Sequence, residues 1–175
     1  MKENDINPEE VESITVYCGT NSMQISGTEN KRIPKTIVAA QFSAYYKVAS
    51  AIVRRRSTAA EYTEEAIQDS TVLDLCRKTE LKLTPEYDTG LFYEKGGRVE
   101  IKTTRKSKLF STDVGIHRGR PENPMTWEDF SHKMKGAAAV CIKSVPENKL
   151  NDLLEMIKNL EAVDDVSEII RLVVP

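Results

Sequence analysis

The sequence predicts an α+β protein in which a mostly antiparallel sheet packs on a long central helix, with further helices at the C-terminal end. Residues 34–53 repeat apolar side chains at the 3.6-residue spacing of a helix. Shorter stretches before and after this segment alternate apolar and polar side chains, which is typical of half-buried strands. The last third of the chain returns to helical spacing. Because strands and helices do not strictly alternate, this order favours the α+β class.

The composition is typical of one globular domain. The chain has 175 residues, of which 39% are hydrophobic and 30% are charged, enough for a core. The formal net charge of -2 gives no overall field that attracts nucleic acid or an anionic membrane. The first ten residues, MKENDINPEE, are unlike a signal peptide, and no apolar run approaches the ~20 residues that span a bilayer. We therefore expect one cytoplasmic domain over residues 1–175, without a membrane partner.

Cysteine and histidine usage favours a protein without a metal centre. Cys18, Cys76 and Cys141 lie far apart and are odd in number, which argues against a disulfide framework or a zinc site. Each lies beside apolar residues, so we expect three reduced, buried thiols. Because His117 and His132 are the only histidines, a histidine-rich metal site is excluded.

The N-terminal stretch is predicted to begin the sheet. Residues 7–10 are typical of a turn or a short helical start. Residues 11–18 (VESITVYC) then alternate apolar and polar side chains, which indicates a half-buried strand. Residues 19–31 are polar and contain Gly, Asn and Ser, so we expect a long loop there.

Residues 34–53 (PKTIVAAQFSAYYKVASAIV) are predicted to form one helix, about 30 Å long. Pro34 suits its first turn, where a missing N–H removes no helical hydrogen bond. The apolar stripe comprises Val38, Phe42, Tyr45, Val48, Ala49 and Ile52. The Arg54-Arg55-Arg56 run follows at the C-terminal end, where positive charge meets the negative end of the helix dipole. We expect this helix to be the centre of the core.

Two short helices and a strand are expected next. Thr63 can cap the first helix and Ser70 the second. Residues 80–84 (ELKLT) alternate as a strand, and Pro85 ends it.

A loop over residues 88–95 and a Gly96-Gly97 turn lead to residues 98–104 (RVEIKTT), which alternate again as a strand. Residues 109–114 are a candidate partner strand. Whether the two strands form a hairpin is left open, because charged residues rather than glycines separate them.

The remaining third is predicted to be a loop followed by helices. Residues 115–125 (GIHRGRPENPM) cannot sustain a helix because they contain two glycines, two prolines and an asparagine. Thr126 begins a helix, with Asp129 in a variant of the capping box. Pro146 opens a Leu-rich helix, and residues 163–174 give a final short one. We expect residues 126–175 to form a helical tail.

The residues alone offer few candidates for chemistry. The sequence carries no GxSxG, HExxH, P-loop or GxGxxG motif. His117, Arg118 and Arg120 share one loop, and forked guanidinium donors could bind a carboxylate there. The alternative is a solvated basic loop.

The basic cluster at residues 102–108 could contact phosphates, but it has few interleaved aromatics, and the chain as a whole has no excess of basic residues. We expect no nucleic-acid partner.

Two runs in the last third, GRPENPMTWEDFSHKM and LLEMIKNLEAVDDVSEIIRLV, are similar to a known family pattern. They resemble the C-terminal region of the MmgE/PrpD family, whose members include 2-methylcitrate dehydratase, cis-aconitate decarboxylase and iminodisuccinate epimerase. The family pattern is a Gly-x-Pro-x-Asn-Pro loop, a helix with a Lys before a bulky apolar residue, and a Leu-rich helix leading to Leu-Glu…Asp-Val. The residues that fit are Gly119, Pro121, Asn123, Pro124, Lys133, Leu160, Glu161, Asp165 and Val166.

The resemblance continues upstream. Residues 7–11 with 13–16 (NPEEV, SITV) are similar to the approach to the family's first lid strand. The AQFS run at 40–43, with Tyr46 and Ala49, resembles the family's helix motif. The likeness therefore runs over nearly the whole chain in one order.

The resemblance implies a fold and a reaction. In the family, a large all-α domain precedes an α+β lid domain that closes over the active site, so this chain looks like the lid. The helical tail would pack on the all-α domain. The family's acid/base histidines, aspartate and lysines lie in that domain, which is expected outside these 175 residues. The family reaction abstracts a proton next to a carboxylate and loses water or carbon dioxide, or shifts the proton. No metal or organic cofactor is implied.

The resemblance also assigns candidate site residues. Tyr46 falls where the family motif has a tyrosine on the lid helix, so it is a candidate catalytic residue. Ser43 precedes it by nearly one helical turn on the same side, and is a candidate for substrate binding together with His117, Arg118 and Arg120.

Two departures from the family motif bear on the lid. Ala44-Tyr45 stands where the family usually has Leu-Pro, and Arg54-Arg55-Arg56 stands where it has an Asp-Gly turn. The loop at residues 119–124 is expected to fix the backbone before the next helix rather than to bind substrate.

Three hypotheses about function follow. The first is a lid-domain chain of an MmgE/PrpD-like lyase or isomerase (dehydratase, decarboxylase or epimerase) for a small di- or tricarboxylate, inactive without a helical-domain partner. The second is a non-catalytic binding or assembly module that retains the fold. The third, nucleic-acid binding at residues 102–108, predicts steeply salt-dependent binding. Exposed apolar surface also predicts self-association, through Leu153, Ile157, Ile169 and Val173.

Overall fold

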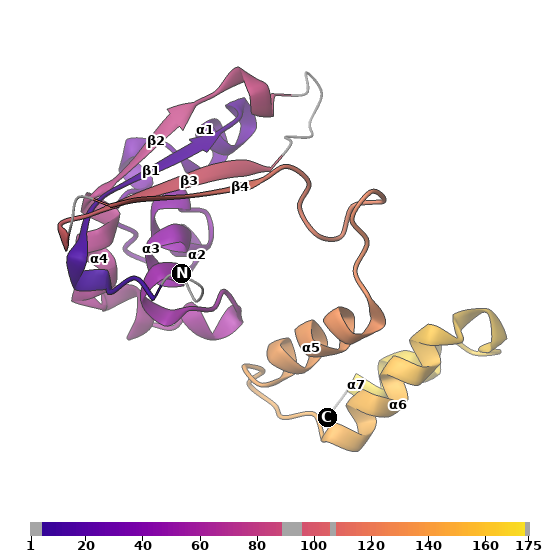
Figure 1. The fold of residues 1–175 in the computed structure, drawn as a ribbon. Coiled ribbons are helices and arrows are strands. Elements are labelled where there is room, and N and C mark those ends of the chain that lie inside the picture. Colours follow the sequence, from indigo (N-terminus) through magenta and orange to yellow (C-terminus); the bar gives the residue numbers. More distant parts are fainter. Residues whose placement is uncertain (1–4, 89–95, 106–107, 174–175) are drawn as a thin grey trace. The chain divides into compact units, whose positions relative to one another are not determined.

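The computed structural model describes residues 5–88, 96–105 and 108–173. This part of the chain forms two compact units, one from residues 1–57 and 61–123 and the other from residues 58–60 and 124–175. The first unit contains the sheet and four α-helices, and the second contains three α-helices (Figure 1). The strands are β1 Val11–Cys18, β2 Thr79–Leu83, β3 Gly97–Thr103 and β4 Leu109–Val114. The helices are α1 Thr20–Ser26, α2 Ile37–Gln41, α3 Ala44–Arg54, α4 Ser70–Arg77, α5 Trp127–Ala138, α6 Glu147–Lys158 and α7 Ser167–Val173.

The strand order in the sheet is β2-β1-β3-β4. β1 pairs in parallel with β2 and antiparallel with β3, which in turn pairs antiparallel with β4. The α+β class is therefore confirmed, and the sheet, which was expected to be mostly antiparallel, is mixed, with two antiparallel pairs and one parallel pair. The parallel pair arises because α1 to α4 lie between β1 and β2 in the chain, and they return the chain to the start of the sheet in the same direction.

The hairpin that the sequence left open is present. β3 and β4 pair from Gly97↔Val114 to Lys102↔Leu109, and the N–H of Thr103 donates to the carbonyl oxygen of Lys108 over 3.0 Å. The predicted loop over residues 88–95 lies, apart from Asp88, outside the described residues, as does Lys106 of the basic cluster.

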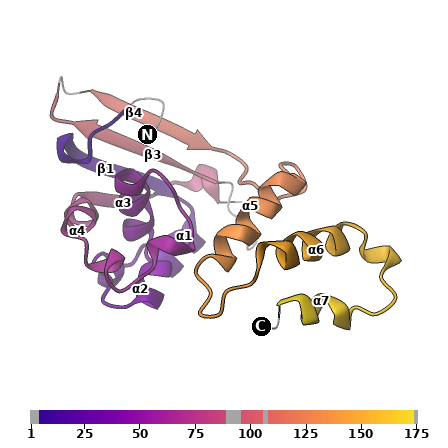
Figure 2. The ribbon, with the colours of Figure 1, turned by 90° about the horizontal axis from the view of Figure 1, so that it is seen from below.

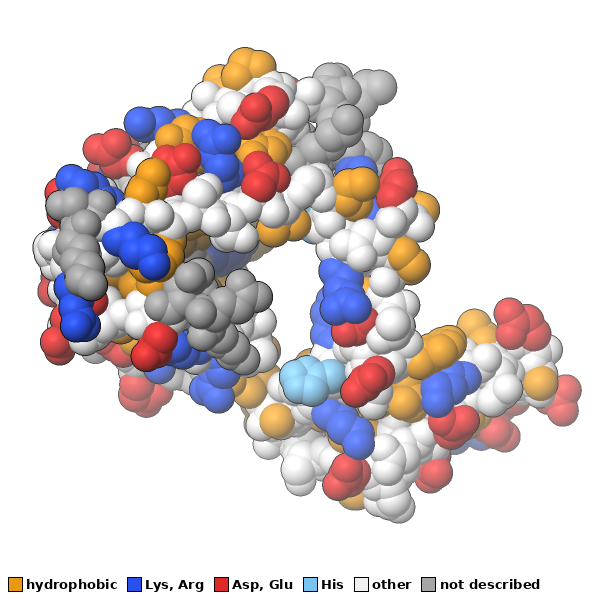
Figure 3. Space-filling model, in the orientation of Figure 1, with side chains coloured by type: hydrophobic (Ala, Val, Ile, Leu, Met, Phe, Trp, Pro, Cys, Tyr) orange, Lys and Arg blue, Asp and Glu red, His pale blue; other side chains and the backbone are white. Residues whose placement is uncertain are grey.

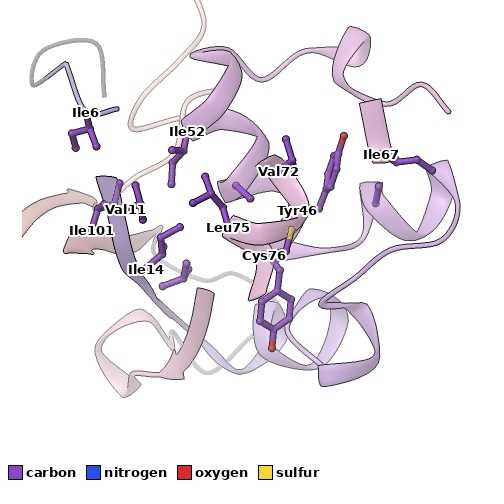
Figure 4. Packing of buried hydrophobic residues seen from close by; sticks show 14 residues of the cluster. Ile6, Val11, Ile14, Tyr46, Ile52, Ile67, Val72, Leu75, Cys76 and Ile101 are labelled. Atoms are coloured by element: carbon purple, nitrogen blue, oxygen red, sulfur yellow. The ribbon is translucent and has the colours of Figure 1, made fainter. Parts of the chain in front are cut away.

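One face of the sheet carries the core of the first unit. Ile14 and Val16 of β1 and Ile101 of β3 are buried, and α1 to α4 lie on this same face (Figure 2). Figure 4 shows how side chains from β1, α3 and α4 meet there. The buried cluster comprises Ile6, Val11, Ile14, Val16, Ala40, Tyr45, Tyr46, Ala49, Ile52, Ile67, Val72, Leu75, Cys76 and Ile101.

The single helix predicted over residues 34–53 is wrong, because it divides into α2 and α3. Phe42 ends α2, and Ser43 takes up an extended backbone with φ -108° and ψ 115°. Its hydroxyl then accepts a hydrogen bond from the N–H of Tyr46 over 3.0 Å and so caps α3. A serine offers the backbone this alternative to the helical ladder, which explains the break.

The long loop predicted over residues 19–31 is also wrong, because Thr20–Ser26 forms α1. Its first turn is capped by a residue far along the chain. Asp88 accepts from the Thr20 N–H over 2.6 Å and from the Thr20 hydroxyl over 2.8 Å. These two bonds hold the pKa of Asp88 below its usual value, the backbone bond being the larger cause. A distant carboxylate therefore supplies the cap that the local sequence lacks.

Both predicted caps in the next stretch need small corrections. The Thr63 hydroxyl accepts from the Ala66 N–H over 3.1 Å, but the element that follows is one turn of 3₁₀ helix, Ala66–Gln68. The cap of α4 is Asp69 rather than Ser70, since its carboxylate accepts from the Thr71 N–H over 2.9 Å.

The three arginines at the end of α3 each pair with a different acidic segment. Arg54 lies 3.0 Å from Asp69, Arg55 lies 3.0 Å from Asp5, and Arg56 lies 2.5 Å from Glu61. These distances join the guanidinium nitrogens to carboxylate oxygens. The run thus ties the end of α3 to the N-terminus, to the 3₁₀ turn at Ala59–Glu61 and to the cap of α4.

The second unit is a set of three helices. Thr126 and Asp129 form a complete capping box at the start of α5, as predicted. Pro146 precedes α6, whose Leu150, Leu153 and Leu154 are buried. Leu153 therefore lies inside this unit, whereas Val173 of α7 is exposed. The packing of these helices on an all-α domain, and self-association through them, stay predictions.

The cysteines partly follow the prediction. None of the three forms a disulfide, and Cys18 and Cys76 are buried whereas Cys141 is exposed, contrary to the expectation that all three are buried. Burial raises the pKa of the Cys76 thiol to about 12.

In the described part of the chain, no helix combines the length and the apolarity that crossing a bilayer needs.

Candidate functional site

The two candidate residues on α3 lie at its first turn, inside the first unit. Ser43 and Tyr46 are both fully buried. The Ser43 hydroxyl donates to the carbonyl oxygen of Lys31 over 2.7 Å while it caps α3. The Tyr46 hydroxyl donates to the carbonyl oxygen of Glu61 over 2.6 Å. Both hydroxyls therefore have hydrogen-bond partners within the fold, in positions that solvent does not reach.

The surroundings of Tyr46 keep its phenol protonated. Burial raises the pKa of Tyr46, while the nearby Arg54 guanidinium lowers it by a smaller amount. The ring packs at a tilt against Tyr62, with 5.8 Å between the ring centroids. Figure 4 shows Tyr46 directed away from Ile6 and Ile101, at the other end of the core. The group can thus donate a proton in a hydrogen bond and is poorly suited to act as a base.

The other candidates share the loop that follows β4. His117 and Arg118 are exposed, and Arg120 is half-buried. Gly119 has φ 98°, a left-handed conformation that suits glycine. The loop therefore carries an imidazole and two guanidinium groups within four residues of one another. The side chains of His117 and Arg118 face solvent.

Asn123 holds this loop closed. Its side-chain amide donates to the carbonyl oxygen of Ile116 over 2.9 Å, and its own carbonyl oxygen accepts from the Gly119 N–H over 2.8 Å. Its N–H donates to the carbonyl oxygen of Arg120 over 3.0 Å. That last bond closes a β-turn with Pro121 at the second position, which proline's fixed φ favours. The loop is thus a defined structure, set by glycine, proline and asparagine.

The structure does not join the two groups of candidates. Ser43 and Tyr46 are linked directly at the start of α3, whereas the loop after β4 runs on beyond the sheet, away from α3 in both ribbon views (Figures 1 and 2). A carboxylate could reach the exposed side chains of the loop, where bidentate guanidinium hydrogen bonds are the matching chemistry. A catalytic role for Tyr46 and substrate binding by Ser43 stay predictions.

The basic cluster at residues 102–108 is partly neutralised. The Lys102 ammonium lies 2.6 Å from a Glu12 carboxylate oxygen, and Arg105 lies 3.6 Å from Glu10. Figure 3 shows acidic and basic side chains intermixed over the face that it presents. Within the described ranges, no group of three or more His, Cys, Asp or Glu side chains is arranged to hold a metal ion.

Comparison with models of known protein families shows which family this chain belongs to. The model of the MmgE/PrpD C-terminal domain matches residues 1–161 of the 175 in the chain. The chain belongs to the MmgE/PrpD family. The match covers β1 to β4, the loop after β4 and the helices through α6, so both units contribute to the MmgE/PrpD domain. A search of curated proteins finds no match.

Sequence patterns alone do not reveal two contributors to the candidate sites. Asn123 was noted only as part of the MmgE/PrpD loop pattern, and its amide proves to be the clamp of the basic loop. The Gly-x-Pro-x-Asn spacing, which sets a β-turn, was the available indication. Glu61 was missed entirely, because it accepts the Tyr46 hydrogen bond through its backbone carbonyl, and any residue type could do this.

Proposed function

We propose that this chain is the lid portion of an MmgE/PrpD lyase or isomerase that acts on a small di- or tricarboxylate. The observation that supports this most is the family match over residues 1–161, which takes in nearly every element of the fold. The family reactions abstract a proton next to a carboxylate, with loss of water or carbon dioxide or with a proton shift. The finer assignment of reaction and substrate is part of the proposal.

In this proposal the loop after β4 binds a substrate carboxylate. Arg118 and Arg120 supply charge-assisted donors, and the Asn123 clamp fixes the backbone that carries them. Such preorganisation lowers the ordering cost of binding a polyanion. His117 adds one more donor at the exposed end of the loop.

The groups that move protons come from a helical domain in this proposal, whether on the same polypeptide or on a partner chain. Ser43 and Tyr46 support the proposal only indirectly, because their hydroxyls are buried and bonded to Lys31 and Glu61. Their contribution is to fix the start of α3. Direct contact of Tyr46 with substrate requires its hydroxyl to leave the Glu61 carbonyl.

That same burial favours the alternative, a non-catalytic module that keeps the MmgE/PrpD lid fold. In this case the chain binds or assembles with other proteins and contributes nothing to turnover. The two proposals differ in what the basic loop does in a complete assembly.

The experiment is an assay of the full chain, alone and together with an MmgE/PrpD helical domain from the same source. Dehydration of 2-methylcitrate and decarboxylation of cis-aconitate are followed by absorbance and by released carbon dioxide. We expect turnover only with the helical domain, and a raised KM in Arg118→Ala/Arg120→Ala.

Arg77→Ala, on the exposed side of α4, is the matched control, since it removes an arginine that pairs only locally with Asp74. It should leave KM unchanged. If the assembly is active and Arg118→Ala/Arg120→Ala leaves its KM unchanged, the loop does not bind substrate. An assembly inactive on every di- and tricarboxylate tested favours the non-catalytic module.

A further inference from the structure

A cavity of about 300 Å³ lies in the first unit, between α3 and the β3–β4 side of the sheet. α3 contributes Val48, Ala51 and Ile52, and the sheet contributes Ile101 and Phe110. Figure 4 shows Ile52 and Ile101 at the end of the core opposite Tyr46 and Ile67. The volume is at the lower end of the roughly 300–1,000 Å³ of pockets that hold small molecules.

The cavity exists because the sheet is wider than the helical layer packed against it. α1, α3 and α4 pack against β1 and β2. The inner side of β4 is left at the wall of the cavity, where Phe110 is only half-buried and Thr112 is exposed. The walls are therefore apolar, with hydroxyl groups at the β4 side.

Among the residues that the structure describes, Lys47 is the one charged residue that lines this cavity. The Lys47 side chain is exposed to solvent, and within the described ranges its ammonium has no hydrogen-bond or ion-pair partner from the protein. Desolvation lowers the pKa of Lys47, and the positive charge of Lys31 lowers it further. An anion placed beside this group would offset both effects.

The neighbouring charges do not supply that anion. Asp5 adjoins Ile6, a lining residue, but its carboxylate pairs with Arg55 over 3.0 Å. A second ammonium, that of Lys108, lies 4.6 Å from the ring centroid of Phe110 at the cavity wall. Within the described ranges, the ammonium groups of Lys47 and Lys108 therefore lie beside a cavity whose walls are otherwise apolar.

We propose that this cavity binds a monocarboxylate with an apolar body, such as a medium-chain fatty acid, with the carboxylate on Lys47 and the hydrocarbon between α3 and Phe110. A di- or tricarboxylate does not fit this description, because its further charges would lie unpaired against apolar walls at a high cost. A neutral hydrocarbon would make no use of the Lys47 ammonium, which is exposed to solvent beside the apolar walls. The site is thus separate from the basic loop and goes beyond the proposed function.

The test is calorimetric titration of the full chain, without a helical domain, using octanoate below its micellar concentration. Octanamide, which has the same body without charge, and citrate, which has charge without the body, are the matched ligands. We expect saturable binding of octanoate, weaker binding of octanamide and no binding of citrate at this site. Since no turnover is measured, failure here is distinguishable from failure of the proposed enzyme function.

Lys47→Met keeps the length and the apolar stem of the side chain and removes the charge. It should weaken octanoate about tenfold, as expected for the loss of about 1.4 kcal/mol from a charge-assisted hydrogen bond, and leave octanamide unchanged. Lys35→Met, at an exposed lysine outside the cavity, is the control and should change neither ligand. Ala51→Trp, which fills the cavity, should abolish binding of both while circular dichroism confirms the fold.

Four outcomes overturn the proposal, three of which concern octanoate and octanamide. These three are the absence of saturable octanoate binding, equal affinity for octanoate and octanamide, and an octanoate affinity that Lys47→Met leaves unchanged. Displacement of octanoate by citrate from the Lys47 site would also overturn it, since the ligand would then be a polyanion.

Discussion

Replacing Tyr46 by Phe tests whether this tyrosine supports the fold or takes part in a reaction. The substitution removes a hydroxyl that is fully buried and that donates to the Glu61 carbonyl over 2.6 Å. The ring and its packing against Tyr62 remain. The loss is the net value of one buried hydrogen bond plus part of the cost of an unpaired carbonyl, about 1.5 kcal/mol in total. For a chain of this size we expect the melting temperature to fall by roughly 3–6 °C.

The measurement is urea unfolding followed by circular dichroism, with the m-value compared to confirm that the unfolded state is the same. Tyr62→Phe is the matched control. Its hydroxyl has no hydrogen bond within the described ranges, and we expect it to change the free energy of unfolding by less than about 0.5 kcal/mol. The reasoning is refuted if Tyr46→Phe is as stable as the parent chain. Lower turnover at unchanged stability, in an assembly with a helical domain, would instead assign Tyr46 to the reaction.

Three further predictions follow from the backbone and its caps. Arg55 ends α3 in the left-handed region, with φ 56° and ψ 23°. Arg55→Gly should therefore be more stable than Arg55→Ala by about 1 kcal/mol in urea unfolding, although both variants lose the ion pair with Asp5. Equal stability of the two variants would contradict backbone strain at this position. Because the pKa of Asp88 is lowered, its cap on α1 is present at neutral pH and is lost as pH falls through a folded-state pKa below 3.8. Thr20→Val removes the hydroxyl that donates to Asp88 and should raise the pKa of Asp88 in an NMR titration. An unchanged midpoint would show that the hydrogen bond from the Thr20 N–H alone lowers this pKa. Asn123→Ala should open the basic loop, so the Gly119 amide hydrogen should exchange faster with solvent. The free energy of unfolding should fall by no more than about 1 kcal/mol. Unchanged protection of this amide would show that the Asn123 side chain does not hold the loop closed.

The strands were the part of the fold that the sequence predicted best. β1 begins and ends at the predicted residues, and β2 and β3 differ from prediction by one residue at each end. Alternation is a local property, so the side chains of one strand suffice to show it. The parallel pairing of β1 with β2 could not be predicted in this way, because both kinds of ladder have the same period of two.

The helices show where local reasoning stops. α1 was missed because the carboxylate that caps it, Asp88, lies 68 residues away from Thr20. The break between α2 and α3 had a local indication in Ser43, but the apolar stripe on both sides of it favoured one continuous helix. A cap can be read from sequence only when it comes from the neighbouring turn, as Thr126 and Asp129 do for α5.

The same limit applies to the candidate sites. The basic loop could be predicted, because glycine, proline and asparagine specify its turn directly. The burial of Tyr46 and the cavity beside Lys47 could not, since each depends on side chains that come together from separate elements.

The central position of β1 has a consequence for how the chain is made. This strand is synthesised first, yet both of its partners, β2 and β3, come from residues 79–83 and 97–103. Until residues 79–83 leave the ribosome, Ile14 and Val16 have no sheet to join, so the nascent chain carries an unpaired apolar strand up to that point. A polypeptide that stops before β3 would leave the β3 side of this strand unpaired and should depend on chaperones or aggregate.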